Sequence, residues 1–559
     1  MEIKMITPKF GVHGQIVTED VATIKDAGFQ TIVCNRPDGE GEDQTDFKKI
    51  QTVAEKLGLT AQYLPVQSGL ITDKNVADFE QLSETLAVPV LAYCKSGTRA
   101  ASLWALRESK RRPISEILAV TKAAGYDLNG LSRRLINKGK IPMEKTISKY
   151  DILIVGAGAA GIAVASSLQA RKSDLSIAVI DPADVHYYQP GWTMVGGGIF
   201  EARQTAKTMA SLIPNGVKWI KSSVAAFEPA KNAVVLDDSN VVSYDRLVVC
   251  PGLKLDWDAV EGLSDTLGRN GVTSNYRFDL APYTWELVQG LNEGKAIFTQ
   301  PPMPIKCAGA PQKALYLSGD AWHKKGRLKN IDISFMNAGG VLFGVKDYVP
   351  ALEKYIQKYG ATVNFFHNLI AVDGSAKRAT FKVSKPDTDP ETIAVDFDML
   401  HVCPPQTAPD FIRVSPLADA VGWVDVDQGT LRHKSFDNIW SLGDVMNAPN
   451  AKTAAAARKQ APTVAENIVA DIDGRSAPVV YDGYGSCPLT VERGKIVLAE
   501  FGYGGALKPS FPKAVLDGTK PTRAAWFLKE KMLPPIYWQA MLKGKEWMAK
   551  PEKIEIAAE

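Results

Sequence analysis

The sequence predicts an α/β protein in which a small N-terminal α/β domain precedes two tandem Rossmann-type domains and a C-terminal helical segment. Three observations support this fold class. Strand-like and helix-like segments alternate along residues 1–110, an apolar strand runs into a glycine-rich turn at 151–161, and a related strand begins near 296. A chain of 559 residues also exceeds what one hydrophobic core usually covers, so about three domains are expected.

The composition is typical of a soluble globular protein and excludes several function classes. Apolar residues make up 45% and charged residues 23%, and a net charge of +3 gives no support to nucleic-acid binding. The six cysteines are scattered without a C-x-x-C pair, so we expect neither a disulfide scaffold nor a metal site. No signal-peptide pattern and no run of about 18 apolar residues occurs, so we expect a cytosolic protein without a membrane span.

The glycine-rich turn predicts a dinucleotide site. A G-x-G-x-x-G turn between a strand and a helix lets a pyrophosphate approach backbone N–H groups at the helix N-terminus. An acidic residue at the end of the next strand suits the adenosine ribose hydroxyls. The residues that fill these positions are Gly156, Gly158, Ala159, Ala160, Gly161 and Asp181.

Two later segments indicate FAD as the dinucleotide. The apolar strand at 244–252 closes on Gly252. The segment at 435–447 ends a strand on Gly443 and Asp444, which suit the ribityl-phosphate part of the cofactor, and the helix after it can direct its N-terminal amides at the flavin ring.

These segments divide the chain into six expected regions. Within the first, strands are expected at 29–37 and 88–94, and helices at 21–29 and 47–58. The regions are 1–110 (first α/β domain), 111–148 (helical extension and linker), 149–285 (FAD-binding domain, first part), 286–415 (second Rossmann-like domain), 416–475 (FAD-binding domain, second part) and 476–559 (C-terminal domain).

The second Rossmann-like domain lacks the glycine turn that a nicotinamide dinucleotide would need. Residues 296–319 read AIFTQPPMPIKCAGAPQKALYLSG, so prolines and Cys307 stand where the glycines are expected. The neighbouring cation of Lys306 is expected to lower the pKa of this thiol. The sequence therefore predicts that a thiol, rather than NAD(P)H, delivers electrons to the flavin.

Several motifs together resemble sulfide:quinone oxidoreductases, in the branch that includes the mitochondrial enzyme. The motifs occur in order from about residue 150 to the C-terminus: HYYQPGWTMVGGG, IKCAGAPQKALYLS, FGVKDY, LHVCPP, GWVDVD, AKTAAAA and YDGYGSCPL. The resemblance implies that sulfide attacks a disulfide beside FAD, that one cysteine keeps a persulfide, and that a membrane quinone takes the electrons. It makes Cys307 one redox cysteine and adds Gln189 and Lys452 as cofactor-binding residues.

The chain departs from this family pattern at the second redox cysteine, where Val445 follows the Gly-Asp pair. Cys403 is the expected substitute, because it ends a strand at the carboxyl edge of the sheet that also carries Cys307. Two alternatives stay open: Cys403 is a buried apolar residue, or Cys307 acts with an external thiol. The remaining cysteines, Cys34, Cys250 and Cys487, are expected to serve packing, with Cys487 in a late turn.

The N-terminal region resembles a small bacterial domain described as protein-tyrosine-phosphatase-like or sulfur-transferase-like. The resemblance depends on GQI, NRPDGE and YCKSGTRAASLWAL, and the fusion resembles predicted bifunctional phosphatase-family/FAD-oxidoreductase proteins. Cys94 and Arg99 have Cys-x4-Arg spacing, one residue shorter than the phosphatase loop, which favours persulfide transfer over phosphate hydrolysis. Phosphatase activity and a non-catalytic anion loop remain alternatives, and Arg36 and Asp38 are candidate pocket residues.

The C-terminal segment mixes aromatic residues with lysines on two short helices that Pro534 and Pro535 are expected to separate. This pattern predicts an interfacial anchor, which suits an enzyme whose oxidant dissolves in the bilayer; a packed hairpin is the alternative. Two histidines are expected to contribute little, with His186 in the core or moving protons near the flavin, and His401 facing away from Cys403.

The sequence as a whole predicts a cytoplasmic protein, peripheral on the inner face of the cell membrane and possibly a homo-oligomer. We expect FAD-dependent oxidation of sulfide with quinone, and transfer of the sulfur to a small thiol or protein persulfide acceptor such as Cys94. The alternatives are an NAD(P)H-dependent disulfide or persulfide reductase, and a phosphatase fused to a flavoprotein redox sensor.

Overall fold

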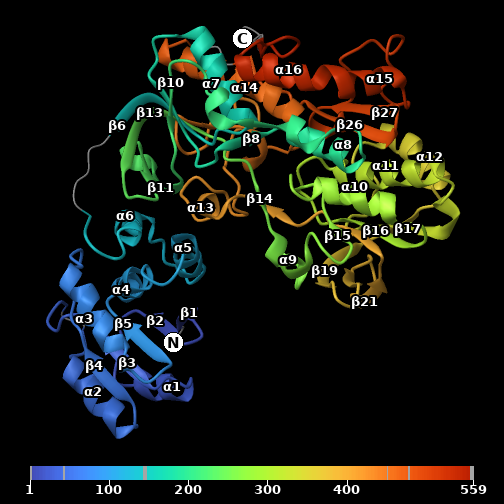
Figure 1. The fold of residues 1–559 in the computed structure, drawn as a ribbon. Helices are drawn as coiled ribbons and strands as arrows, with labels where there is room; N and C mark the ends of the chain where they lie inside the picture. The colour runs from blue at the N-terminus through green and yellow to red at the C-terminus, as the bar shows by residue number, and fades with distance from the viewer. Residues whose placement is uncertain (1–2, 42–43, 143–147, 450, 476–478, 554–559) are drawn as a thin grey trace. The chain divides into compact units, whose positions relative to one another are not determined.

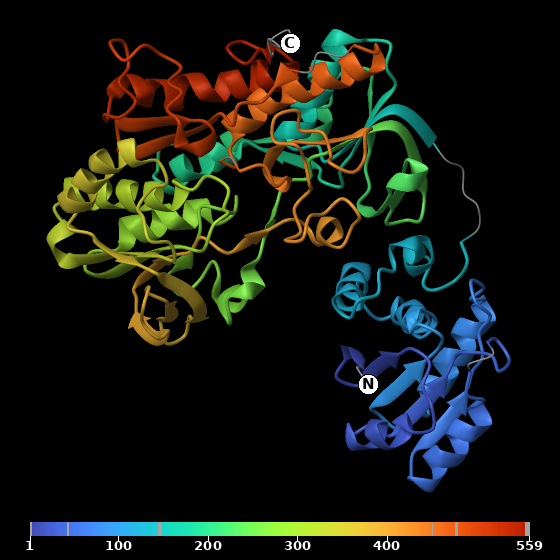
Figure 2. The same ribbon diagram turned by 180° about the vertical axis from the view of Figure 1, so that it is seen from behind.

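The fold was analysed in a computed structural model, which describes residues 3–41, 44–142, 148–449, 451–475 and 479–553 (Figure 1; Figure 2 from behind). The chain forms two compact units. The first comprises residues 1–149, 222–244 and 410–422, and the second comprises 150–221, 245–409 and 423–559. These units are defined by compactness, so the region boundaries given above stay predictions.

A five-stranded sheet lies at the centre of the N-terminal part of the first unit. Its strand order is β1-β2-β5-β3-β4, with β1 antiparallel to β2 and the other neighbours parallel. Apolar clusters cover both faces, which explains the continuous apolar runs of β3 and β5. The elements are β1 Lys4–Thr7, β2 Phe10–His13, α1 Asp20–Asp26, β3 Thr31–Cys34, α2 Phe47–Lys56, β4 Thr60–Tyr63, α3 Asp73–Ser83, β5 Val90–Tyr93 and α4 Thr98–Glu108.

A helical extension follows this sheet within the first unit, as the sequence predicted. It consists of α5 Ile114–Ala123, η1 Asn129–Leu131 and α6 Ser132–Ile136; of the polar linker expected at 141–150, residues 143–147 lie outside the described residues. The unit also contains β11 Val224–Glu228, β12 Ala233–Leu236 and α13 Asp410–Arg413. Arg133 on α6 forms an ion pair with Glu228 at 2.6 Å, which joins the extension to β11.

The glycine-rich turn lies in a parallel sheet of the second unit. Here β6 pairs in parallel with β7, β7 with β10, and β13 with β24. Two helices, α7 and α14, pack against each other beside this sheet. The elements are β6 Ser148–Val155, α7 Ala159–Arg171, β7 Ile177–Ile180, β10 Val217–Ile220, β13 Val241–Val249, β24 Ile439–Ser441 and α14 Ala454–Ile472.

A second parallel sheet in the same unit has the order β15-β22-β16-β17-β18. Helices α10, α11 and α12 belong to this region, and an antiparallel sheet β19-β20-β21 follows β18 (Figure 1). The elements are β15 Val272–Thr273, α10 Ala281–Gly290, β16 Gly294–Gln300, α11 Ala310–Lys324, β17 Ile331–Asn337, α12 Val349–Lys358, β18 Thr362–Phe365, β19 His367–Asp373, β20 Arg378–Val383, β21 Glu391–Asp396 and β22 Met399–His401. The predicted pair of Rossmann-type sheets is therefore present.

The C-terminal region begins with the antiparallel hairpin of β26 Gly485–Glu492 and β27 Lys495–Phe501. Its helical part runs from α15 Arg523–Phe527 through a π-helical turn, η11 Leu528–Met532, into α16 Leu533–Gln539. The expectation that Pro534 and Pro535 separate two helices is wrong. Both prolines lie in the first turn of α16, where a missing backbone N–H is tolerated.

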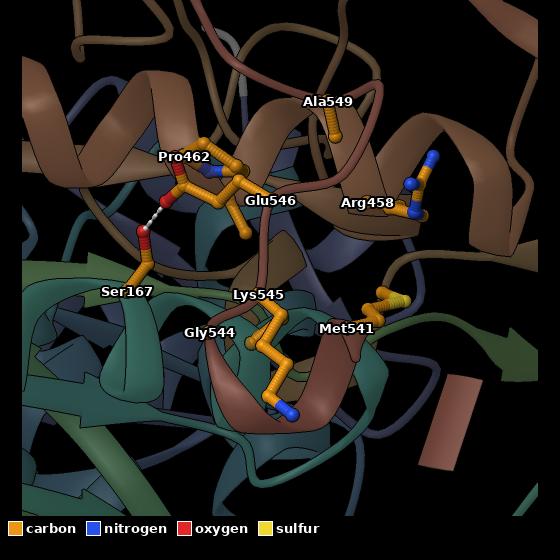
Figure 3. Close-up of a pocket in the computed structure, with 10 residues that line it drawn as sticks. Ser167, Arg458, Pro462, Met541, Gly544, Lys545, Glu546 and Ala549 are labelled. Atoms are coloured by element: carbon orange, nitrogen blue, oxygen red, sulfur yellow. Dashed lines mark hydrogen bonds between the residues drawn. The ribbon is translucent and has the colours of Figure 1, made fainter. Parts of the chain in front are cut away.

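The last helical turn, η12 Met541–Lys543, docks against α7. Ser166 on α7 donates a hydrogen bond to the Leu542 carbonyl at 2.9 Å, and Ser167 donates to Glu546 at 2.6 Å (Figure 3). A small pocket between these elements and α14 has room for about one water molecule, which is too little for a cofactor. Among the described residues, none of the helices is both long and apolar enough to cross a bilayer.

Candidate active site

Two cysteine sulfurs lie close together in the second unit. The Sγ atoms of Cys307 and Cys487 are 3.6 Å apart, and both cysteines are free thiols. Cys487 is buried and Cys307 is half-buried, so one member of the pair is accessible. This juxtaposition centres the candidate active site on a dithiol.

Cys307 occupies the loop between β16 and α11, three residues before the helix begins. Its backbone has φ +50°, an uncommon conformation for a residue with a side chain. Two hydrogen bonds hold the loop: the Cys307 N–H donates to the Lys452 carbonyl at 2.8 Å, and the Ala310 N–H donates to the Cys307 carbonyl at 2.7 Å. The thiol is thereby fixed at the N-terminus of α11 and beside the segment that leads into α14.

Cys487 lies on strand β26, so its expected place in a turn is wrong. The strand approaches the N-terminus of α11 closely because residue 309 is glycine. A Cβ atom at Gly309 would lie 2.7 Å from the Cys487 sulfur and 2.2 Å from Leu489. Glycine is therefore needed here for space, and it allows the two sulfurs to meet.

Lys313 provides the cation of the thiol pair. Its Nζ donates a hydrogen bond to the Cys307 sulfur at 3.0 Å, and its side chain is buried on α11. The Cys487 thiol donating to Cys307 and the Lys313 charge together hold the pKa of Cys307 well below its usual value, despite burial. The same hydrogen bond and burial raise the pKa of Cys487. The resting pair is thus a thiolate at Cys307 and a neutral thiol at Cys487.

Lys306, which the sequence suggested as that cation, is directed elsewhere. Its Nζ donates to the Gln189 side chain at 2.6 Å and lies 5.7 Å from the ring centres of Trp192 and Tyr276. Burial lowers the pKa of Lys306. The cation beside the Cys307 sulfur is that of Lys313, one turn into α11, and not that of Lys306 as the sequence suggested.

Lys529 brings a second buried cation from the C-terminal π-helical turn. Its Nζ donates to the Pro190 carbonyl at 3.1 Å, and only 3% of the residue is exposed. Burial and then repulsion from Lys313 lower the pKa of Lys529 to about 7, while the Cys307 thiolate opposes this shift. The C-terminal segment therefore contributes to the electrostatics of the thiol pair.

Cys403 belongs to the same apolar cluster as Cys307, but its sulfur has other neighbours. Gln406 Nε2 donates a hydrogen bond to this sulfur at 3.7 Å, and the thiol donates to the Pro404 carbonyl at 3.9 Å. Burial raises the pKa of Cys403 to about 12. A neutral thiol with these contacts is a poor nucleophile at neutral pH.

The predicted dinucleotide turn has the backbone that its function requires. Gly156 has φ +101°, and a Cβ there would lie 2.6 Å from the Cys250 carbonyl. A Cβ at Gly161 would lie 1.8 Å from the Gly156 carbonyl, so only glycine lets α7 pack this closely on β6. Gly158, in contrast, faces open space at the start of α7, where Ala159 and Ala160 begin the helix. This combination leaves a cradle for a pyrophosphate.

The neighbouring acidic residue is held in place by backbone groups. Asp181 accepts hydrogen bonds from the N–H groups of Ala157 at 2.7 Å and Ala183 at 2.8 Å. Gly252 has φ +78° and faces open space after β13. Cys250 is buried with its sulfur near the Gly156 carbonyl, in keeping with a packing role.

The Gly-Asp segment lies between α7 and α14. A Cβ at Gly443 would approach Ala160 to 3.2 Å, and the Gly443 N–H donates to Gln460 at 2.8 Å. Lys452 Nζ donates to the carbonyl of Asp444 at 2.7 Å, and burial raises the pKa of the Asp444 carboxyl. The Gly-Asp segment, the glycine turn and the Cys307 loop are therefore joined by direct contacts.

His186 and His401 are both buried and form structural hydrogen bonds. His186 donates from Nδ1 to the Ala157 carbonyl at 3.1 Å, and its Nε2 accepts from Tyr537 at 2.6 Å. Burial lowers the pKa of His186 to about 4, so it is neutral. His401 accepts from the Asn275 N–H at 2.9 Å. His186 thus fastens the C-terminal segment to the glycine turn.

A second thiol site lies in the first unit. Cys94 follows β5, is buried, and accepts a hydrogen bond from the Gly97 N–H at 3.2 Å. Gly97 has φ +88° at the start of α4, and a Cβ there would lie 2.1 Å from the Tyr126 hydroxyl. One backbone amide of the loop, that of Gly97, therefore donates to the sulfur, and the predicted cradle of several amides stays a prediction.

Glu40 forms ion pairs with both arginines near this loop. Arg99 forms a fork on the Glu40 carboxylate at 2.9 and 2.6 Å, and Arg36 donates to the same carboxylate at 2.9 Å. The hydrogen bond from Arg99 lowers the pKa of Glu40. The Asp38 carboxylate accepts a hydrogen bond at 2.9 Å from the N–H of Phe47, which is the first residue of α2. Both arginines bind the Glu40 carboxylate, which compensates one of their two positive charges.

Sequence reasoning missed four residues of these sites: Cys487, Lys313, Lys529 and Glu40. Lys313 lies one turn into α11, six positions after Cys307. Because helical side chains point toward the N-terminus of their helix, the Lys313 side chain can reach the preceding loop. Cys487 is 180 residues away from Cys307 along the chain, so only the fold brings it there. Within the described residues, histidine, cysteine and acidic side chains do not gather in threes as a metal site would need.

Comparison with known proteins assigns families to both parts of the chain. Residues 2–110 match the family described as Beta-lactamase hydrolase-like protein, phosphatase-like domain, and residues 150–282 match Pyridine nucleotide-disulphide oxidoreductase. A Beta-lactamase hydrolase-like protein of Xylella fastidiosa is 34% identical over 130 residues, which is 23% of this chain and 30% of that protein.

The remainder of the chain is similar in sequence to sulfide:quinone oxidoreductases. The mitochondrial sulfide:quinone oxidoreductase of Dictyostelium discoideum is 42% identical over 446 residues, covering 78% of this chain and 97% of that protein. The solved sulfide:quinone oxidoreductase of Aquifex aeolicus covers 73% of this chain and 97% of its own, with 17% identity and a TM-score of 0.61, and so shares the fold. The chain therefore belongs to the sulfide:quinone oxidoreductase family and carries a phosphatase-like domain ahead of its Rossmann-type domains.

Proposed function

We propose that the protein oxidises sulfide and delivers the electrons to a membrane quinone. The observation that carries this proposal is the Lys313 Nζ atom 3.0 Å from the Cys307 sulfur, in a loop that lacks the glycine turn for a nicotinamide dinucleotide. Relatives that match nearly their whole length are named for this reaction. The competing function is that of an NAD(P)H-dependent reductase. This function is disfavoured because the segment after β16 has no glycine turn for a second pyrophosphate.

FAD is the cofactor that the residues of the first sheet fit. The Gly156–Gly161 turn and the N-terminus of α7 would hold the pyrophosphate, Asp181 the adenosine ribose, and the Gly443–Asp444 segment the ribityl part, with Gly252, Gln189 and Lys452 beside them. When bound, FAD supplies a two-electron acceptor that a quinone can reoxidise.

The protein's own side chains prepare the sulfur chemistry. Lys313 keeps Cys307 deprotonated, and the apolar cluster around Ile305 and Ala310 limits access of water. The Lys313 ammonium, together with Lys529 in its protonated form, adds positive charge, which attracts the hydrosulfide anion. These groups therefore bring a nucleophilic anion to a dithiol site.

We also propose that the Cys94 loop accepts sulfur rather than hydrolysing phosphate. A phosphatase loop needs the full charge of its arginine for a phosphate dianion, whereas Glu40 occupies both nitrogens of the Arg99 fork. A persulfide on Cys94 carries a smaller charge and can use the amides of the loop. Fusion of the two domains raises the effective concentration of the acceptor.

The C-terminal helices are proposed as the contact with the membrane, on the inner face of the cell membrane. Their exposed apolar side chains include Phe527 at 58% and Met532 at 44%, and the exposed lysines 531, 543 and 545 accompany them. Aromatic and aliphatic side chains with basic neighbours suit an interface with anionic lipid headgroups. A peripheral position gives access to a quinone dissolved in the bilayer.

Anaerobic stopped-flow absorbance tests the proposed function. Equal concentrations of sulfide and NADH are mixed with the FAD-loaded protein, and a water-soluble quinone is then added. Sulfide is expected to bleach the flavin at least about 100-fold faster than NADH, with quinone restoring the colour. Faster bleaching by NADH would instead assign a pyridine-nucleotide reductase.

A further inference from the structure

We propose that Cys487 is the second redox cysteine of this protein and that it carries the sulfane sulfur. The inference deepens the proposed function and rests on it, because it names the partner with which Cys307 forms the disulfide that sulfide opens. In the resembling enzymes that partner follows the Gly-Asp pair, but this chain has Val445 there, a fully buried residue without a sulfur.

The distance between the two sulfurs supports a reversible disulfide. A disulfide bond is about 2.05 Å long, so the observed 3.6 Å between Cys307 and Cys487 must shorten by about 1.5 Å. Side-chain rotations provide movements of this size without a change of fold. No described sulfur contact of this kind joins Cys307 to Cys403, whose sulfur contacts Gln406 and the Pro404 carbonyl.

The space around the pair is shaped for this contact. Gly309 leaves β26 free to approach α11, and its hypothetical Cβ would press on the Cys487 sulfur at 2.7 Å. Cys487 also belongs to the core cluster against which Cys307 packs, so the approach is stabilised by burial on both elements. The pair is therefore built into the interface between the second Rossmann sheet and the C-terminal hairpin.

The position of Lys313 determines which sulfur sulfide attacks. In thiol–disulfide exchange, the sulfur that departs best is the one whose thiolate is more stable. Lys313 donates to the Cys307 sulfur and stabilises its anion, so Cys307 departs and Cys487 is attacked. The direction of both pKa shifts agrees, since that of Cys307 is lowered and that of Cys487 is raised.

The reaction then balances in three steps. Hydrosulfide forms an S–S bond with Cys487 as the Cys487–Cys307 bond breaks, which gives Cys487–S–SH and the Cys307 thiolate. After that persulfide loses its proton, an acceptor thiolate removes the outer sulfur as R–S–S⁻ and leaves the Cys487 thiolate. The two thiolates rejoin as a disulfide, and the two electrons released reduce the quinone of the proposed function, which takes two protons.

Peptide mapping by mass spectrometry tests the pair directly. The FAD-loaded protein is oxidised with a thiol oxidant, digested without reduction, and searched for cross-linked peptides. A Cys307–Cys487 cross-link is expected, and a Cys307–Cys403 cross-link would overturn the proposal. A second sample receives one equivalent of sulfide and is then alkylated. The added sulfur is expected on Cys487, and its location on Cys307 would overturn the assigned direction.

Matched variants distinguish this proposal from the proposed function. Cys487→Ser is expected to keep FAD and reduction by dithionite, but to slow bleaching by sulfide by roughly 100-fold or more. Cys403→Ser, the control with a sulfur in the same region, is expected to stay within about twofold of the wild type. Wild-type rates in Cys487→Ser would overturn the assignment of Cys487 alone. Failure of sulfide to bleach the wild-type flavin would overturn the proposed function, whichever cross-link forms.

Discussion

The Nζ atom of Lys313 lies 3.0 Å from the Sγ atom of Cys307, and the lysine is fully surrounded by protein. A buried ammonium beside a thiolate is stable because each charge compensates the other, and removal of one partner leaves the other charge uncompensated. The pair therefore sets both the reactivity of Cys307 and the local electrostatics.

Replacement of this lysine tests the thiolate. Lys313→Met keeps most of the side-chain volume but removes the charge, so the pKa of Cys307 is expected to rise. The rate of alkylation by iodoacetamide, followed from pH 5 to 10, should shift its midpoint to higher pH. Lys306→Met is the control, because Lys306 contacts Gln189 instead. An unchanged midpoint in Lys313→Met would remove Lys313 from the account.

Lys529 gives the protein a pH-dependent stability. Its pKa falls from 10.5 to about 7 on folding, so between these values the unfolded chain holds one more proton than the folded chain. The free energy of unfolding contributed by this site therefore rises as the pH increases from 7 to 10. Lys529→Met is the variant that removes this group. The titratable groups that shift the pKa of Lys529, which are Lys313, Cys307 and Cys487, are unchanged in it.

Thermal unfolding of the wild type and Lys529→Met at several pH values measures this effect. The melting temperature of the wild type should rise relative to that of the variant between pH 7 and 10, at constant ionic strength. A constant difference between the two proteins over this range would mean that Lys529 keeps an ordinary pKa.

Glu40→Gln tests why the Cys94 loop does not suit phosphate. The substitution keeps the shape but frees the charge of Arg99 and Arg36, so inorganic phosphate is expected to bind at least about tenfold more tightly. Calorimetric titration of the full-length protein provides the measurement, and Cys94→Ser in the same experiment reports on binding without the thiol. Tight phosphate binding by the wild type would favour a phosphatase.

The membrane contact is tested by introducing negative charge in place of two exposed apolar side chains. Phe527→Glu with Met532→Glu is expected to reduce sedimentation with anionic phospholipid vesicles by roughly tenfold, because carboxylates are repelled by the headgroups. Val341→Glu changes an equally exposed apolar residue of the same unit outside the C-terminal helices and serves as the control. Equal sedimentation of both variants would contradict the proposed anchor.

Local sequence patterns were sufficient for most of the fold. The glycine turn at Gly156, the strand that closes before Gly252 and the Gly443 segment all occur where their sequence placed them, because each depends on contacts within a strand–turn–helix unit. The position of the Cys307 loop after the first strand of the second sheet was predictable for the same reason.

The parts that sequence reasoning missed depend on distant segments. Cys487 meets Cys307 only because a hairpin near the C-terminus folds onto α11, and no local pattern marks that contact. The prolines at 534 and 535 looked like a break, yet the π-helical turn before them lets the helical path continue into α16. Long-range packing decided both outcomes.

The central claim is that a protein thiolate, rather than a reduced nicotinamide, supplies the electrons. Cys307→Ala tests it most directly when the FAD-loaded variant is mixed anaerobically with sulfide and its flavin absorbance is followed. We predict full FAD occupancy, normal reduction by dithionite and no bleaching by sulfide. Bleaching of the variant at the wild-type rate would contradict the account.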